Sequence, residues 1–134
     1  PYTTLFRSHR GSGKYFIAEA DESDGSFIAY HPHAAIVTNV EHDHVDFFAT
    51  ADEVTTVFKN FASTIPADGF LIYFNDDAGS RSLGEKVDHC TTYSYGTDPT
   101  SDLKIDQIEL TAAGSQAKVQ LDAKTPSTVF YPVR

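Results

Sequence analysis

The stretch "ADEVTTVFKNFASTIPADGFLIYFN" (residues 51–75) decides the fold, because a helical pattern runs directly into a strand-like one. Its first part has one apolar face, formed by residues that recur at helical spacing: Val54, Val57, Phe58, Phe61 and Ile65. Thr50 and Glu53 fit the capping-box pattern at the start of a helix. We therefore predict a helix over residues 51–65 with Thr50 as its N-cap.

The second part, "GFLIYFN" (residues 69–75), is a continuous apolar run typical of a strand that is buried on both faces. Two similar runs precede the helix, at residues 14–20 and 33–40, and another follows at residues 91–96. A short helix is predicted at residues 78–86, between the last two strands. Strands that alternate with helices indicate right-handed crossovers, and so a mainly parallel sheet covered by helices on both faces.

The pattern changes after residue 102. "LKIDQIEL" (residues 103–110) and "SQAKVQL" (residues 115–121) alternate between apolar and polar residues, with a turn between them. We predict an antiparallel hairpin at the edge of the sheet or beyond it. The predicted fold class is therefore α/β, with a mainly parallel sheet flanked by helices and a C-terminal antiparallel β-hairpin.

Composition limits the functions open to the chain. Its 134 residues, 40% of them hydrophobic, suit one modest globular domain. A formal net charge of -9 argues against nucleic acid or an anionic membrane as a partner, since both bind positive surfaces. Cys90 is the only cysteine, which excludes an intrachain disulfide and fits a reducing cytoplasm. No apolar run approaches the roughly 18 residues of a membrane span. Met is absent, so we expect a fragment or a processed piece of a longer protein.

Acidic and imidazole side chains gather behind two of the predicted strands. Glu19 closes the first strand, and a dense group follows the second: Glu41, His42, Asp43, His44 and Asp46. Because ligands of open α/β sheets bind outside the carboxyl ends of the strands, both groups are expected to face one crevice. Carboxylate, imidazole and water suit Mg²⁺ or Mn²⁺. The alternative is a set of solvated loop acids, and spacing alone does not separate the two.

Two other chemical motifs are weaker. "RGSGKY" (residues 10–15) resembles a phosphate loop, but Tyr15 stands where the Walker pattern needs Ser or Thr, and a strand follows instead of a helix. We interpret it as a turn. Cys90 beside His89 suggests a nucleophile, but no orienting group is evident, and a loop or strand-edge thiol is the preferred interpretation.

Three blocks together resemble a known family. "YFIAEADESDGSF" (residues 15–27), "AAIVTNVEHDHVDFF" (residues 34–48) and "NDD" (residues 75–77) are similar, in order and separation, to the central domain of the Mur ligases of peptidoglycan synthesis. Within that family they resemble the branch that adds L-alanine to UDP-N-acetylmuramate. The resemblance implies a cytoplasmic ATP-dependent ligase that works through an acyl phosphate with Mg²⁺ or Mn²⁺. Its partners would be UDP-N-acetylmuramate, L-alanine and ATP, with no nucleic acid and no membrane.

The resemblance also implies residue roles. Glu19 and His44 correspond to the family's metal-binding glutamate and histidine, and we expect them to be catalytic. Asp43 and Asp46 would orient these ligands, whereas His42 is expected to face solvent. The substrate side of the cleft would be shaped by Asp21, Glu22, Ser23 and Asp24. Asn75, Asp76 and Asp77 either lie near the nucleotide or form a strand-ending turn.

The ends of the chain depart from the family. The phosphate loop expected before residue 11 is not found, and neither is the I-P-G-x-H-N segment expected near residue 121. Residues 1–10 and 123–134 match nothing in the resemblance, so we expect foreign or frameshifted ends around a partial central domain at residues 11–122. We expect the isolated chain to be inactive. The alternatives are a stand-alone α/β module that binds a divalent metal or another ligand, and a non-functional translation product of a truncated gene.

Overall fold

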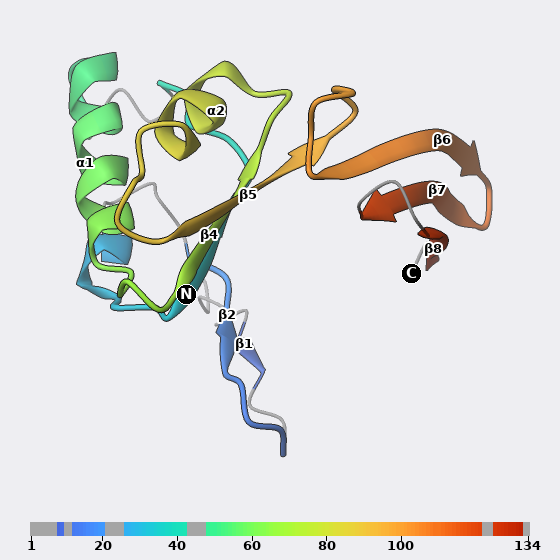
Figure 1. Cartoon of the computed structure of the whole chain (residues 1–134), viewed down its shortest axis with the longest axis horizontal. Coiled ribbons are helices and arrows are strands. Elements are labelled where there is room, and N and C mark those ends of the chain that lie inside the picture. Colours follow the sequence, from blue (N-terminus) through green and yellow to red (C-terminus); the bar gives the residue numbers. More distant parts are fainter. Residues whose placement is uncertain (1–7, 10–11, 21–25, 43–47, 122–124, 133–134) are drawn as a thin grey trace, which may run out of the picture.

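The structure is a computed structural model of the chain, and it describes residues 8–9, 12–20, 26–42, 48–121 and 125–132 (Figure 1). The elements follow in the order β1 (Ser8–His9), β2 (Ile17–Ala18), the 3-10 helix η1 (Ser26–Ala29), β3 (Ala34–Val37), α1 (Ala51–Ser63), β4 (Phe70–Phe74), α2 (Ala78–Gly84), β5 (Thr91–Gly96), β6 (Leu103–Thr111), β7 (Gly114–Leu121) and β8 (Thr125–Pro132). One sheet has the order β3-β4-β5-β6-β7-β8, and β1 pairs with β2 separately. Among the described helices, none is long and apolar enough to cross a membrane.

Helix α1 forms where its apolar stripe predicts it. Thr50 Oγ1 accepts a hydrogen bond from the backbone N–H of Glu53 at 3.2 Å, which confirms the predicted N-cap. The Glu53 carboxylate in turn accepts from the backbone N–H of Ala49 at 2.8 Å, one residue earlier than in the standard capping box. The helix ends at Ser63, two residues before the predicted end, and Ile65 is buried just beyond it.

The first three strands of the large sheet are parallel, as predicted. β4 lies between β3 and β5, with Ala35 opposite Leu71 and Leu71 opposite Thr92. Leu71 has no exposed surface, because both helices pack on its face of the sheet. The core on that face consists of Val37, Ala62, Ile65, Leu71 and Leu83.

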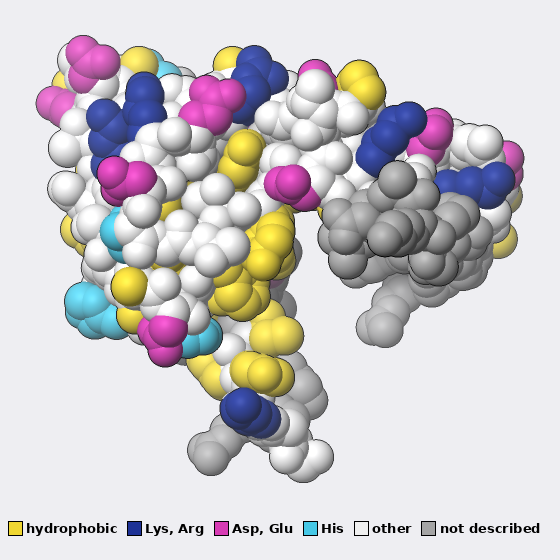
Figure 2. Space-filling model, viewed as in Figure 1, with side chains coloured by type: hydrophobic (Ala, Val, Ile, Leu, Met, Phe, Trp, Pro, Cys, Tyr) yellow, Lys and Arg dark blue, Asp and Glu magenta, His cyan; other side chains and the backbone are white. Residues whose placement is uncertain are grey.

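The opposite face of these strands is uncovered by any described element, so the prediction of helices on both faces is wrong. Ile36, Ile72 and Tyr93 lie side by side on this face, and Ile36 and Tyr93 are 66% and 47% exposed. Figure 2 shows hydrophobic side chains gathered beside the hollow under the connection from β5 to β6. The reason is topological. The crossovers from β3 to β4 and from β4 to β5 advance in the same direction, so crossovers of one hand place both helices on one face.

The predicted antiparallel hairpin is confirmed as β6 and β7, and β8 continues it as a third antiparallel strand. The hairpin is joined to the main sheet, because Tyr95 and Gly96 of β5 pair in parallel with Leu103 and Lys104. Beyond this short join, β6 and β7 extend away from the helices (Figure 1). The fold class predicted from the sequence is therefore confirmed: a mainly parallel sheet with two helices, followed by antiparallel strands.

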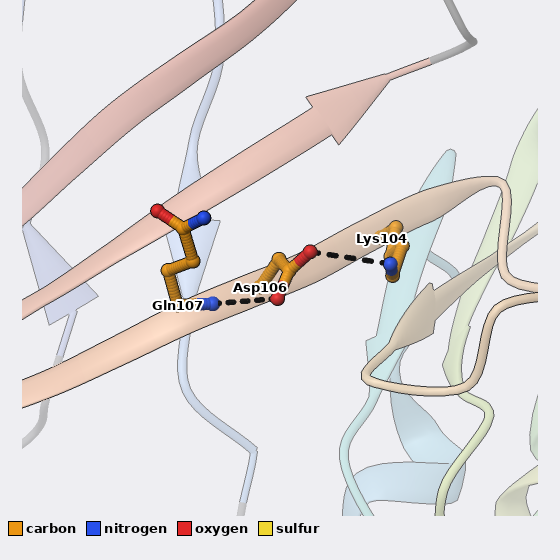
Figure 3. Close-up of polar contacts among 3 residues, drawn as sticks. All are labelled: Lys104, Asp106 and Gln107. Atoms are coloured by element: carbon orange, nitrogen blue, oxygen red, sulfur yellow. Dashed lines mark hydrogen bonds and ion pairs between the residues drawn. The ribbon is translucent and has the colours of Figure 1, made fainter.

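A β-bulge interrupts the hairpin between Asp106 and Glu109. Gln107 takes a positive φ of 48° there, a conformation that disfavours side chains other than glycine. The Asp106 carboxylate accepts the backbone N–H of Gln107 at 2.8 Å and contacts Lys104 Nζ at 3.2 Å (Figure 3). These bonds hold the pKa of Asp106 below its ordinary value, the backbone N–H of Gln107 contributing most.

The prediction for residues 14–20 is wrong in its pairing and its burial. Only Ile17 and Ala18 form a strand, and they pair antiparallel with β1 instead of lying beside β3. Tyr15, Phe16 and Ile17 are between 65% and 78% exposed. An apolar run indicates that burial of the segment is favourable, but it does not determine which strand the segment pairs with. Here it pairs with a segment only a few residues away, which needs a short loop to close.

Candidate functional site

The candidate site lies at the carboxyl ends of β3, β4 and β5, which meet at one edge because the strands are parallel. The chain leaves β3 toward Val40, whereas Asn75, Asp76 and Asp77 follow β4 directly. These four residues therefore lie at the edge where the resemblance expects the nucleotide and the metal.

Asp77 is the N-cap of α2, and it also reaches the chain that leaves β3. Its Oδ1 accepts from the backbone N–H of Ser80 at 2.6 Å and from the backbone N–H of Val40 at 3.0 Å. Ser80 is fully buried and links the same elements: its hydroxyl donates to the Val37 carbonyl at 3.2 Å and accepts from Phe74 N–H at 3.0 Å. The start of α2 is thus hydrogen-bonded to both β3 and β4.

Gly79 explains how α2 comes so close to the end of β3. A Cβ atom at this position would collide with the carbonyl oxygen and the side chain of Val40. Backbone oxygen has little freedom to move, so any larger residue at position 79 would push the two elements apart.

Asn75 ties the turn after β4 to the connection between β5 and β6. Its buried amide donates to the hydroxyls of Thr100 and Ser101, at 3.3 and 3.1 Å. Arg81, on α2, donates to the Asn75 carbonyl at 2.6 Å. The side chain and carbonyl of Asn75 are therefore both engaged within the fold.

Asp76 binds the segment that follows β5. Its carboxylate accepts from the backbone N–H and the hydroxyl of Thr97 at 2.7 and 2.8 Å, and from Asp98 N–H at 3.0 Å. The backbone N–H of Thr97 is the main cause that holds the pKa of Asp76 below its ordinary value. Gly96 lets the carboxylate approach, since a Cβ there would collide with it. All three residues after β4 therefore make the bonds of a strand-ending turn, the alternative kept open by the sequence.

The structure describes two residues that are important for the predicted site, His42 and Glu19. His42 is exposed, as expected, but its Nε2 also lies 2.9 Å from the Phe48 carbonyl oxygen, a contact between the two residues that flank the undescribed positions 43–47. Glu19 is exposed, one residue past β2. Because β2 does not lie beside β3, strand adjacency does not bring Glu19 to the edge, and its sharing of a site with His44 stays a prediction.

Most of the predicted metal and substrate residues lie outside the described residues: Asp21, Glu22, Ser23, Asp24, Asp43, His44 and Asp46. Within the described part of the chain, no three His, Cys, Asp or Glu side chains are grouped so that they would hold a metal ion.

Cys90 and His89 do not form a nucleophilic pair. His89 Nε2 lies 3.2 Å from the Ile65 carbonyl oxygen, and Cys90 packs against the hydrophobic core. Burial raises the pKa of the Cys90 thiol, opposed by a backbone hydrogen bond from Leu71. Cys90 lies directly before β5, in agreement with the loop or strand-edge thiol preferred from the sequence.

The fold and this edge define a class of protein: an α/β domain with interlinked polar side chains where its parallel strands end, the usual place for a ligand in such sheets. The chain belongs to the Mur ligase family, because the family description "Mur ligase middle domain" matches residues 2–130. The match includes residues at both ends that the resemblance in the sequence leaves outside the domain.

Relatives agree with this assignment, and a solved structure agrees with the fold. The chain is 35% identical over 128 residues to the UDP-N-acetylmuramate–L-alanine ligase of Salinispora arenicola, which covers 94% of this chain and 25% of the relative. It is 45% identical over 98 residues, or 71% of this chain and 21% of the relative, to the protein of that name from Arthrobacter sp.. Its fold matches the UDP-N-acetylmuramate-alanine ligase MurC of Thermotoga maritima with a TM-score of 0.66 at 18% identity, over 85% of this chain and 24% of that one. The chain thus spans about a quarter of the length of these proteins.

Proposed function

We propose that the chain forms part of an ATP-dependent ligase that joins L-alanine to UDP-N-acetylmuramate. The observation that carries the proposal is the similarity to curated L-alanine ligases over 94% of the chain, including the acidic and histidine blocks. The edge at the ends of β3, β4 and β5 supports it, because that is where an α/β sheet binds its ligand.

In this proposal the substrate carboxylate attacks the γ-phosphorus of ATP, and ADP leaves. The amine of L-alanine then attacks the resulting acyl phosphate, the amine loses a proton, and inorganic phosphate departs as the amide forms. Glu19 and His44 would hold Mg²⁺ or Mn²⁺, which, when bound, neutralises charge on the phosphates. Asp43 and Asp46 would orient these ligands.

The remaining candidate residues would act on either side of that centre. The substrate side would be formed by the acidic block Asp21, Glu22, Ser23 and Asp24. The turn of Asn75, Asp76 and Asp77 would border the nucleotide, shaping the edge through the bonds described above. The proposed use of ATP and the single cysteine, which fits a reducing compartment, support a cytoplasmic location.

The test is a complete ligase built around this segment, in which residues 12–121 replace the matching part of the Salinispora arenicola relative; we call it the restored ligase. We expect it to release ADP only when ATP, UDP-N-acetylmuramate and L-alanine are all present, and to form the corresponding amide. D-alanine serves as the matched control for the amino acid. A folded restored ligase that hydrolyses ATP without L-alanine, or that couples another amino acid in its place, would contradict the proposal.

A further inference from the structure

The start of α2 makes three separate contacts with the end of β3 and the chain that leaves it. Asp77 Oδ1 accepts from Val40 N–H, the Ser80 hydroxyl donates to the Val37 carbonyl, and Gly79 packs directly on Val40. Asp77 and Val40 are 37 residues apart, and Ser80 and Val37 are 43 apart, so these are tertiary contacts between two elements.

These three contacts lie directly before the segment that holds the predicted metal ligand. Val40 directly precedes Glu41 and His42, and the predicted metal ligand His44 comes four residues after Val40. A displacement of Val40 would therefore also displace the residues that follow it, on which the chemistry of the proposed ligase depends. Small displacements of reacting groups cost up to about 100-fold in rate, so a fixed exit from β3 has catalytic value.

We propose that Asp77, together with Gly79 and Ser80, is a positioning element that sets the course of the chain after β3, and that Asp77 is not a ligand of the nucleotide or the metal. This inference rests on the proposed function for its effect on turnover. Its structural part stands on the three contacts alone.

The two roles make different demands on residue 77. Positioning needs one oxygen that accepts two N–H groups, which the side-chain oxygen of asparagine supplies, and Asn caps helices as well as Asp does. A metal or phosphate-linked role needs the negative charge, which asparagine lacks. Asp77→Asn and Asp77→Ala therefore separate the two roles.

In the restored ligase, we expect Asp77→Asn to keep kcat within about threefold, because Asn keeps the cap. We expect Asp77→Ala to lower kcat by about tenfold or more with little change in KM for ATP, the sign of lost positioning. Asp88→Ala, an exposed carboxylate in the loop after α2, is the matched control and should leave both constants unchanged. Equal losses in Asp77→Asn and Asp77→Ala, or a KM for ATP that rises equally in both, would overturn the proposal.

Amide hydrogen exchange in the 134-residue chain tests the structural part without any activity. The Val40 amide should be protected in the wild type and in Asp77→Asn, and should exchange faster in Asp77→Ala, while the Leu71 amide reports any global loss of stability. An unchanged Val40 amide in Asp77→Ala would refute the positioning role. If the wild-type restored ligase is inactive, the proposed function fails, but the exchange result still decides the role of Asp77.

Discussion

Gln107 is the one non-glycine residue in the described part of the chain with a positive φ. Its conformation is supported by Asp106, whose carboxylate accepts its N–H, while Lys104 contacts the other carboxylate oxygen (Figure 3). The Lys104 and Asp106 side chains are 37% and 56% exposed, so solvent screens their ion pair, and the backbone bond contributes more to holding Gln107. The residue thus adopts a conformation for which glycine is better suited.

We expect Gln107→Gly to raise the melting temperature, because glycine removes a conformational cost of about 1 kcal/mol at this φ. Gln116→Gly is the matched control, since Gln116 lies opposite Glu109 in the regular part of β7. There glycine should destabilise by about 0.5–1 kcal/mol. Thermal unfolding followed by circular dichroism measures both. A fall in melting temperature for Gln107→Gly as large as that for Gln116→Gly would show that residue 107 is not strained.

Asp76 gives a prediction about acid stability. Its pKa is lowered in the fold, mainly by the Thr97 N–H, so the folded state favours the carboxylate. The resulting stability is present above the ordinary pKa of 3.8 and is lost as the pH falls through the lower folded value. Denaturant unfolding measured from neutral pH down to about pH 3 gives the free energy of unfolding of both proteins. At neutral pH, Asp76→Asn should be less stable than wild type, and this difference in free energy should become smaller as the pH falls. A gap that stays constant with pH would contradict this, and Asp88→Asn serves as the control.

At the scale of elements, hydrophobic periodicity predicted the positions of helices and strands, which depend on local burial. It did not predict which strands pair, because pairing depends on segments elsewhere in the chain. The helix at Ala51–Ser63 and the strands at Phe70–Phe74 and Thr91–Gly96 follow from apolar spacing. The bulge had a signal in the sequence: apolar residues fall at odd positions up to Ile105 and at even positions from Ile108, and one extra residue restores a common face. The pairing of β2 had no such signal in the sequence, because an apolar run does not determine which strand it pairs with.

The uncovered face of β3, β4 and β5 should bind a hydrophobic dye. Ile36 and Tyr93 are exposed there, and Tyr95 pairs with Leu103, so the apolar face continues onto the hairpin. We expect the double variant Ile36→Ser, Tyr93→Ser to lower the fluorescence of bound anilinonaphthalene sulfonate relative to wild type. Thr56→Ser, on the exposed side of α1, should leave it unchanged. Equal fluorescence in all three proteins would place the dye elsewhere.

At the scale of the molecule, sequence motifs located the candidate edge, but not the contacts that build it. The blocks around Glu19, His44 and Asn75 identified the family. The link from Asp77 to Val40 joins residues far apart in sequence, and polar residues after a strand show only that a turn follows. Such a contact becomes predictable only when the order of the strands and the packing of α2 are known.

The 134 residues contain no G-x-x-x-x-G-K-[ST] segment, and this predicts their behaviour as an isolated chain. Backbone amides and a lysine of such a loop hold the β- and γ-phosphates in nucleotide-binding proteins. We therefore expect no ligase activity and only weak ATP binding by titration calorimetry. The restored ligase is the positive control. A micromolar dissociation constant for the isolated chain would show that its own residues suffice to bind ATP.

The turnover of His44→Ala in the restored ligase, measured beside its melting temperature, tests the central claim most directly. If His44 and Glu19 hold the metal of an L-alanine ligase, His44→Ala should lower kcat by about 100-fold or more, as loss of a group that stabilises transferring phosphate does, with little change in melting temperature. His42→Ala should cost only the bond to Phe48, about 1 kcal/mol of stability, and much less turnover. Equal losses of turnover in the two variants would contradict the account and leave the histidines as part of an acidic loop.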